Sequence, residues 1–239
     1  MPTVHNLPQP FKIAEVIEES YRVKTFVLEG SFEAEPGQFV MLWLPGVDEK
    51  PFSLVNSNPV TLTVARVGPF TSELHRRKPG DTLWLRGPFG NGFTLEGEHL
   101  LLIGGGYGVA PLLFLARKAR EGGRRVSVVI GASTARDVIL AEDFLALGCH
   151  VIIATEDGSR GFRGKAPEVA EELLRDINPD ALYACGPEGM LEAVRMMAGR
   201  RGLPVQLSYE SYIRCAIGVC GSCQRSGWLV CRDGPVRRA

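Results

Sequence analysis

Four cysteines crowd into the C-terminal end of this 239-residue chain with the spacing C-x4-C-x2-C-x7-C: Cys215, Cys220, Cys223 and Cys231. The x4 and x2 gaps are those of plant-type [2Fe–2S] proteins, in which four thiolates hold two irons, two on each. The loop between them is rich in small residues, which let the backbone wrap closely around such a group: Ala216, Gly218, Gly221 and Ser222. The spacing therefore predicts a [2Fe–2S] segment with these four cysteines as its metal ligands.

Two other uses of the clustered cysteines stay open. A zinc ribbon usually contains two C-x2-C pairs, and only Cys220 and Cys223 form one here. The thiols could also lie on the surface without any metal. Cys149 stands apart from the cluster in the sequence, and we expect it to be a buried structural thiol.

The expected compartment is the cytoplasm. The N-terminal segment MPTVHNLPQPFK lacks the basic start and apolar core of a signal peptide. The most apolar stretch, residues 100–116, is interrupted by four glycines and Pro111, and it is too short to cross a bilayer. In a reducing cytosol, clustered cysteines bind metal more often than they form disulfides.

The charge balance excludes two classes of partner. Lys and Arg total 27, as do Asp and Glu, so the net charge is zero. A neutral chain has no global field to attract nucleic acid or an acidic membrane surface. We expect neither as a partner.

Two patterns of secondary structure precede the cysteines. Residues 10 to about 95 contain short β-branched and aromatic runs ended by Gly, Pro, Asn or Asp, which predict an antiparallel β-barrel. From residue 98, strand and helix patterns alternate, which predicts a parallel-sheet α/β domain. This second pattern stops after Pro204. We predict three parts: a barrel at 1–97, an α/β domain at 98–206 and a cysteine segment at 207–239.

A glycine-rich turn, LLLIGGGYGVAP, follows the first strand of the α/β pattern and opens a helix. Glycines there allow a pyrophosphate to approach the backbone, and a helix N-terminus favours negative charge. The turn is not a full G-x-G-x-x-G fingerprint, so a tight turn without a ligand stays open. A second strand end, YACGP, should reach the same edge of the sheet. The candidate nucleotide-binding residues are Gly104, Gly105, Gly106, Gly108, Val109, Cys185, Gly186, Pro187 and Met190.

These pieces, in this order, resemble the ferredoxin-NADP reductase superfamily, in which a barrel binds flavin and an α/β domain binds the nicotinamide nucleotide. KPFS at 50–53 resembles the superfamily's R-P-x-S/T flavin motif, with lysine in place of arginine. VAR at 64–66 resembles the next flavin-contacting strand, and GPFTS at 68–72 stands where the superfamily has a Gly-x-Gly-Thr phosphate turn, with Phe70 in place of glycine. The resemblance implies FAD contacts at Lys50, Pro51, Phe52, Ser53, Val64, Ala65, Arg66, Phe70, Thr71 and Ser72.

Within the superfamily, three features resemble the electron-transfer subunits of the class 1B dihydroorotate dehydrogenases. They are GPFGNGF at 87–93, the four-cysteine tail, and VCRDGPV at 230–236. The resemblance implies an NAD-linked flavin oxidoreductase subunit of pyrimidine (UMP) biosynthesis. Electrons would pass from a dihydroorotate-oxidising FMN subunit through [2Fe–2S] and FAD to NAD+, in a heterotetramer of two catalytic and two electron-transfer subunits. No side chain is expected to act as an acid or base, and Ser53 and Cys185 would position the reacting rings.

Two other functional hypotheses stay open. Related NAD(P)H-dependent subunits share this order of domains, namely those of NADPH:ferredoxin transhydrogenase, sulfide dehydrogenase or hydrogenase. NADP selection needs basic groups at the 2′-phosphate, for which Arg136 is a candidate, although we expect NAD. The other hypothesis is an iron–sulfur redox sensor without catalytic turnover, but no element of the sequence resembles a DNA-binding motif.

Overall fold

The computed structural model describes residues 5–239, so the first four residues of the predicted barrel lie outside the described part. The described chain forms two compact units. The first combines the chain up to Gly92 with Glu210–Val236, and the second combines Phe93–Tyr209 with Arg237–Ala239. The cysteine segment therefore belongs to the same unit as the N-terminal strands.

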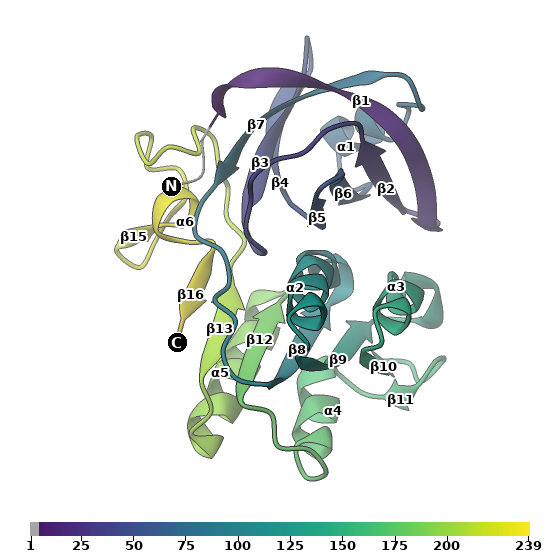
Figure 1. The fold of residues 1–239 in the computed structure, drawn as a ribbon, viewed down its shortest axis with the longest axis vertical. Coiled ribbons are helices and arrows are strands. Elements are labelled where there is room, and N and C mark those ends of the chain that lie inside the picture. Colours follow the sequence, from purple (N-terminus) through teal and green to yellow (C-terminus); the bar gives the residue numbers. More distant parts are fainter. Residues whose placement is uncertain (1–4) are drawn as a thin grey trace. The chain divides into compact units, whose positions relative to one another are not determined.

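The first unit contains a seven-stranded sheet in the order β4-β3-β7-β1-β2-β6-β5, with antiparallel neighbours throughout. In the long strand β1, the register shifts between Ile13 and Glu15 and again between Glu18 and Ser20, and such bulges bend a strand; its curvature is visible in Figure 1. Strands β4 and β6 contact each other, so the sheet curls on itself. The antiparallel β domain is confirmed, with strands β1 (His5–Ser20), β2 (Val23–Leu28), β3 (Phe39–Leu44), β4 (Asp48–Ser53), β5 (Asn56–Ser57), β6 (Val60–Ala65) and β7 (Thr82–Phe89).

A short helix, α1 (Pro69–Leu74), interrupts the stretch for which the sequence predicts strands only. Six residues are fewer than two turns, so they show no recognisable helical periodicity. Pro69 stands in the first turn, where its missing N–H costs no helical hydrogen bond.

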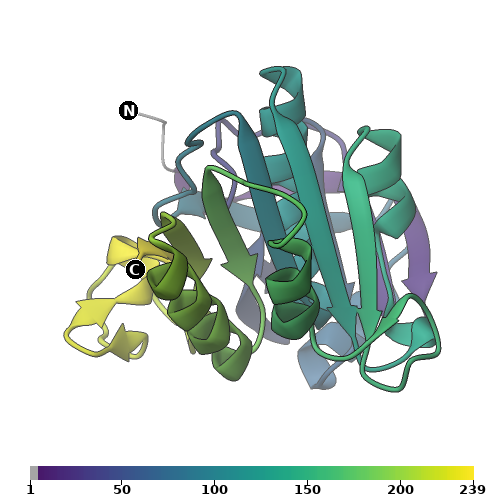
Figure 2. The same cartoon turned by 90° about the horizontal axis from the view of Figure 1, so that it is seen from below.

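The second unit contains the sheet β11-β10-β9-β8-β12-β13-β16. The pairs from β11 to β13 are parallel, which confirms the predicted α/β fold. Strand β8 is buried along almost its whole length, as expected for a strand covered on both faces. Figures 1 and 2 show α2 and α3 over one face and α4 and α5 over the other. The strands are β8 (His99–Gly105), β9 (Arg125–Ala132), β10 (His150–Thr155), β11 (Phe162–Arg163), β12 (Ala181–Cys185), β13 (Val205–Ser208) and β16 (Val236–Arg238), and the helices are α2 (Val109–Glu121), α3 (Ala141–Ala146), α4 (Ala166–Leu173) and α5 (Glu188–Arg201).

The α/β pattern continues past Pro204, where the sequence predicts its end. Strand β13 pairs in parallel with β12, and β16 lies beside β13 at the edge of the sheet. A strand of four residues is too short to show a pattern of its own, so its place is decided by pairing with β12. Among residues 5–239, no helix combines the length and apolar character needed to cross a membrane.

The cysteine segment folds onto the barrel strands. It contains a small hairpin of β14 (Gln224–Arg225) and β15 (Trp228–Leu229), followed by α6 (Val230–Asp233). Its buried side chains share one apolar cluster with residues of β3 and β7: Phe39, Met41, Phe89, Ile213, Ala216, Cys223, Val230 and Cys231. Two of the predicted metal ligands are therefore held by packing against the barrel.

Candidate cofactor sites

The four clustered thiols lie in two neighbouring pairs. The Sγ atoms of Cys223 and Cys231 are 3.2 Å apart, and the Cys231 N–H donates to Cys223 Sγ at 3.4 Å. In the second pair, the Cys220 N–H donates to Cys215 Sγ at 3.5 Å. Two thiols on each of two centres is the donor set that a [2Fe–2S] cluster requires. The pairing of Cys215 with Cys220 and of Cys223 with Cys231 therefore fits this donor set.

The two pairs differ in their surroundings. Cys223 and Cys231 are each 2% exposed, whereas Cys220 is exposed. Burial, reinforced by the neighbouring Cys223 thiol, raises the pKa of Cys231 to about 12. Hydrogen bonds from the Ser222 hydroxyl and backbone lower the pKa of Cys220 to about 6. One half of the site thus lies inside the apolar cluster and the other half lies at the surface.

The motifs at 87–93 and 230–236 meet each other beside the cysteines. The Asn91 N–H donates to the Gly234 carbonyl at 2.5 Å, and the Asn91 side chain donates to the Arg232 carbonyl at 3.4 Å. On the other side, the Gln38 amide donates to the Gly90 carbonyl at 2.8 Å. The two motifs are therefore halves of one contact, which closes the end of the cysteine segment onto the end of β7.

The predicted flavin segments also come together. Phe52 of β4 and Phe70 of α1 stack with their ring centroids 6.1 Å apart and their planes at 25°. Phe70 is 6% exposed. This stacking explains why phenylalanine stands where the superfamily has glycine: the ring joins KPFS to the turn at 68–72.

Thr71 supports that turn with its side chain. Its hydroxyl accepts the N–H groups of Val67 and Gly68 at 2.9 and 3.0 Å and lies 3.1 Å from the Gly68 carbonyl, to which it donates. These bonds use the full capacity of a hydroxyl group. If Thr71 contacts the flavin, the contact would therefore be made by its backbone and not by its hydroxyl group.

Lys50 lies between two partners in the first unit. Its ammonium group is paired with Asp48 on the same strand, and it lies 5.8 Å from the ring centroid of Tyr212. This ion pair is the main reason that the pKa of Asp48 is lowered. Ser53 ends the same strand opposite Phe39. In the predicted phosphate contact, Asp48 and the ligand would therefore share the three donors of the Lys50 ammonium group.

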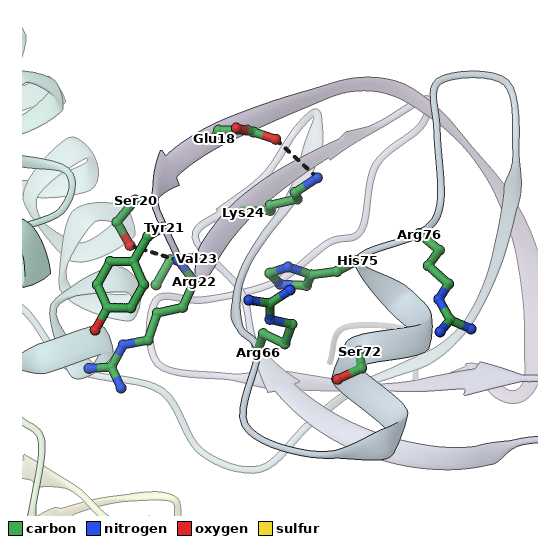
Figure 3. Close-up of a pocket in the computed structure, with 10 residues that line it drawn as sticks. All are labelled: Glu18, Ser20, Tyr21, Arg22, Val23, Lys24, Arg66, Ser72, His75 and Arg76. Carbon is green, nitrogen blue, oxygen red and sulfur yellow. Dashed lines mark hydrogen bonds and ion pairs between the residues drawn. The ribbon is translucent and has the colours of Figure 1, made fainter.

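Two other predicted flavin residues, Arg66 and Ser72, border a pocket. The pocket has a volume of 540 Å³ and is lined in part by Arg66 and Ser72. The side chains come from the turn between β1 and β2, the end of β6, and α1 (Figure 3). Its wall contains one carboxylate and four cationic side chains, which favour an anionic ligand such as a dinucleotide phosphate: Glu18, Arg22, Lys24, Arg66 and Arg76.

The predicted nucleotide residues of the second unit meet at the carboxyl ends of β8 and β12. Cys185 is the register partner of Gly104 in this parallel pair. The 3-10 turn Gly106–Gly108 and the first turn of α2 follow β8, while Gly186 and Pro187 lead from β12 into α5. Open α/β sheets bind their ligands at this edge.

Packing requires most glycines of this turn. A Cβ atom on Gly105 would lie 2.7 Å from Met190 Sδ, and one on Gly108 would lie 2.6 Å from the Cys185 carbonyl oxygen. A Cβ on Gly104 would lie 2.8 Å from Val109 Cα. Gly106 instead has a φ of 56° and open space at its Cβ position. Three glycines therefore shape the turn, and Gly106 is the one at which a ligand could approach the backbone.

Arg136, the candidate for a 2′-phosphate, is exposed in the short 3-10 turn Ala135–Asp137 after β9. The neighbouring Asp137 carboxylate accepts the Thr134 hydroxyl at 2.8 Å. A negative charge thus stands beside the arginine, which favours the free ribose hydroxyl of NAD over a second phosphate.

Cys149 is expected to resist alkylation in the folded protein. It is 6% exposed, and burial raises its pKa to about 11. At pH 8 the reactive thiolate is then only about a thousandth of the population. Labelling with iodoacetamide, followed by peptide mass spectrometry, should modify Cys149 rapidly only after denaturation. Equal rates in the folded and denatured protein would contradict a packing role.

Comparison with known proteins gives two family matches. Residues 102–196 match the oxidoreductase NAD-binding domain. Residues 210–239 match the iron–sulfur cluster binding domain of dihydroorotate dehydrogenase B. The second match covers all four clustered cysteines.

Full-length relatives and solved structures agree with these matches. The chain is 42% identical over 227 residues to a probable dihydroorotate dehydrogenase B (NAD(+)) electron transfer subunit of Methanocaldococcus jannaschii, covering 94% of this chain and 87% of the relative. The same description applies to a Thermococcus kodakarensis protein that is 45% identical over 224 residues, covering 94% and 93%. A structure of an NADH-dependent reduced ferredoxin-NADP oxidoreductase superposes with a TM-score of 0.86 at 30% identity, covering 95% of this chain and 87% of that chain.

Proposed function

The chain belongs to the family of dihydroorotate dehydrogenase B electron transfer subunits, and from this membership we propose that it carries electrons from a dihydroorotate-oxidising FMN subunit, by way of a [2Fe–2S] cluster and FAD, to NAD+. Oxidation of dihydroorotate to orotate releases two electrons and two protons. NAD+ takes up both electrons and one proton, and the other proton goes to solvent. The protein is thus an NAD-linked flavin oxidoreductase subunit of pyrimidine biosynthesis.

The observation that carries this function is the position of the four thiols. They lie in two pairs on the same folded unit as the flavin motif, packed against β3 and β7. Bound FAD exchanges electrons one or two at a time, which joins a one-electron cluster to a two-electron nicotinamide. The protein binds and orients these groups: the four cysteines hold the irons, KPFS and the turn at 68–72 hold the flavin, and the turn at 104–109 with Cys185–Pro187 holds the nucleotide.

We further propose a cytoplasmic heterotetramer of two catalytic and two electron-transfer subunits. The exposed half of the thiol site supports docking of the partner nearby, because electrons must leave through the cluster. Cys220 is exposed there, with Ile217 and Val219 showing 52% and 79% of their surface. The net charge is zero, so such a local apolar patch is a better basis for docking than a long-range field.

The test is reconstitution under anaerobic conditions. The purified chain should contain FAD, iron and sulfide, with flavin bands near ~450 nm above broad iron–sulfur absorbance. Mixing it with a dihydroorotate-oxidising FMN subunit should produce NADH and orotate in equal amounts. A colourless chain containing zinc, or a loaded chain that produces no NADH with this subunit, would refute the function.

A second candidate is a subunit that exchanges electrons between ferredoxin and NADP. The 30% identity and TM-score of 0.86 to the NADH-dependent reduced ferredoxin-NADP oxidoreductase favour it. The relatives described as dihydroorotate dehydrogenase B subunits are 40 to 45% identical, which favours the first function. Parallel assays with NADH and NADPH, each with reduced ferredoxin or the FMN subunit, distinguish the two candidates.

Replacing Lys50 by alanine is expected to weaken FAD binding about tenfold or more, because a hydrogen bond to a charged group contributes about 1.5–3 kcal/mol. Lys50→Arg should keep the affinity, since it restores the arginine usual at this position. The measurement is the FAD dissociation constant from quenching of flavin fluorescence, with the exposed Lys12→Ala as the control. An unchanged constant in Lys50→Ala would remove this residue from the flavin site.

A further inference from the structure

Arg86 of β7 links the flavin strand to the cysteine segment. Its guanidinium group forms a bidentate ion pair with Glu49 of β4, with Nε–Oε1 and Nη2–Oε2 distances of 2.6 Å. Its remaining terminal nitrogen donates to the carbonyl oxygen of Cys215 at 3.1 Å. The Arg86 side chain is 13% exposed and that of Glu49 is 24% exposed, so the pair is largely shielded from water.

The neighbouring structure fixes this pair in place. Arg86 faces Met41 and Glu49 faces Trp43 in the sheet, so the two side chains reach each other across β3. The guanidinium group also lies 5.2 Å from the ring centroid of Phe89, which belongs to the apolar cluster under the cysteines. An arginine fork held on a carboxylate has little freedom to turn, so the third hydrogen bond is aimed at Cys215 in advance.

The charges of the pair act on the thiol site in opposite directions. A cation beside Cys215 stabilises the additional electron of a reduced cluster, and an anion destabilises it. Net charge is one of the means by which proteins set iron–sulfur potentials, together with hydrogen bonds to the sulfurs and solvent exposure. With both partners present, the two effects largely cancel, and the hydrogen bond to Cys215 remains.

We propose that Arg86, oriented by Glu49, is a positioning residue that fixes the first cluster ligand and balances the charge that sets the reduction potential of the cluster. The inference rests on the proposed function, because it requires the cluster to be present. It adds two residues that no cysteine spacing or flavin motif contains. Glu49 directly precedes the flavin motif at Lys50, so the same strand serves both cofactor sites.

The test compares Arg86→Met, Glu49→Gln and the double variant, each as the full chain loaded with cluster and FAD. Arg86→Met leaves an unpaired carboxylate and should lower the potential of the cluster. Glu49→Gln leaves an unpaired cation and should raise it. Each change is expected to alter the equilibrium constant of one-electron reduction about tenfold, or about 59 mV, and the double variant should return close to the wild-type value. Redox titration followed by electron paramagnetic resonance measures these potentials.

The matched control is Arg195→Met. This substitution breaks a bidentate ion pair of the same type with Glu192 on α5, and it should leave the reduction potential of the cluster unchanged. Loss of iron from Arg86→Met with FAD retained would support the positioning role of Arg86. The reduction potential of the cluster in Glu49→Gln would then test the effect of the charges. Shifts of the same sign in both single variants, or no shift with full iron content, would overturn the proposal. A wild-type chain without any cluster signal would instead refute the proposed function.

Discussion

Cys223→Ala is expected to abolish NAD+ reduction driven by dihydroorotate, while reduction of a small dye by NADH continues. Cys223 is 2% exposed, its Sγ lies 3.2 Å from that of Cys231, and it accepts the Cys231 N–H. Alanine has no donor atom, so one iron of the proposed cluster would lose its thiolate ligand. Changes in the outer shell of a metal site already cost about 10–100-fold, and we expect the loss of a ligand to exceed about a hundredfold.

The dye reaction separates the cluster from the other cofactors. In the proposed function, NADH binds the second unit and FAD binds the motif at 50–53 and the turn at 68–72, and none of these segments contains Cys223. The rate of dye reduction by NADH should therefore stay within about twofold of the wild-type rate. It is measured from the absorbance of the dye, on variant and wild-type protein with matched FAD content. Cys149→Ala provides the control for removal of a buried thiol outside the thiol site. Equal loss of both activities in folded, FAD-loaded Cys223→Ala would mean that the serial order of the cofactors is wrong.

The cysteine site was accessible to prediction because its information is local. Three of the predicted ligands lie within nine residues, and the spacing alone restricts the metal chemistry. What the segment packs against is not local. Arg86 and Cys215 are 129 positions apart, and Gln38 reaches Gly90 across 52. Such contacts depend on the register of β3 and β7, which no periodicity of a single strand determines.

The glycine-rich turn shows a different limit of prediction from the sequence. Its position after a strand and before a helix predicts a nucleotide site, and the structure places the predicted residues of β8 and β12 side by side. The sequence cannot distinguish glycines that meet a ligand from glycines that meet the protein. Gly105 and Gly108 are of the second kind, since Met190 and the Cys185 carbonyl fill the space of their missing Cβ atoms. Substitutions at these two positions therefore test folding before they test binding.

Gly90→Ala is expected to loosen the cysteine segment far more than Gly46→Ala. The two glycines have nearly the same φ, 76° and 77°, so each alanine meets a left-handed strain of about 1–2 kcal/mol. A Cβ on Gly46 would meet open space, whereas one on Gly90 would lie 2.4 Å from the Gly234 carbonyl oxygen and 2.6 Å from Pro235 Cδ. Overpacking of this kind adds about 1–3 kcal/mol.

The extra cost at Gly90 acts on the cluster because of where the contact lies. Gly234 accepts the N–H of Asn91 and donates its own to Val230, the residue before the last ligand, Cys231. Pushing Gly234 away therefore opens α6 beside the buried pair of thiols. Gly90→Ala should lose iron to a chelator at least about tenfold faster than Gly46→Ala, since about 1.4 kcal/mol corresponds to a factor of ten in the opening equilibrium. Equal rates of iron loss in the two variants would show that the contact between the motifs at 87–93 and 230–236 does not hold the cluster segment closed.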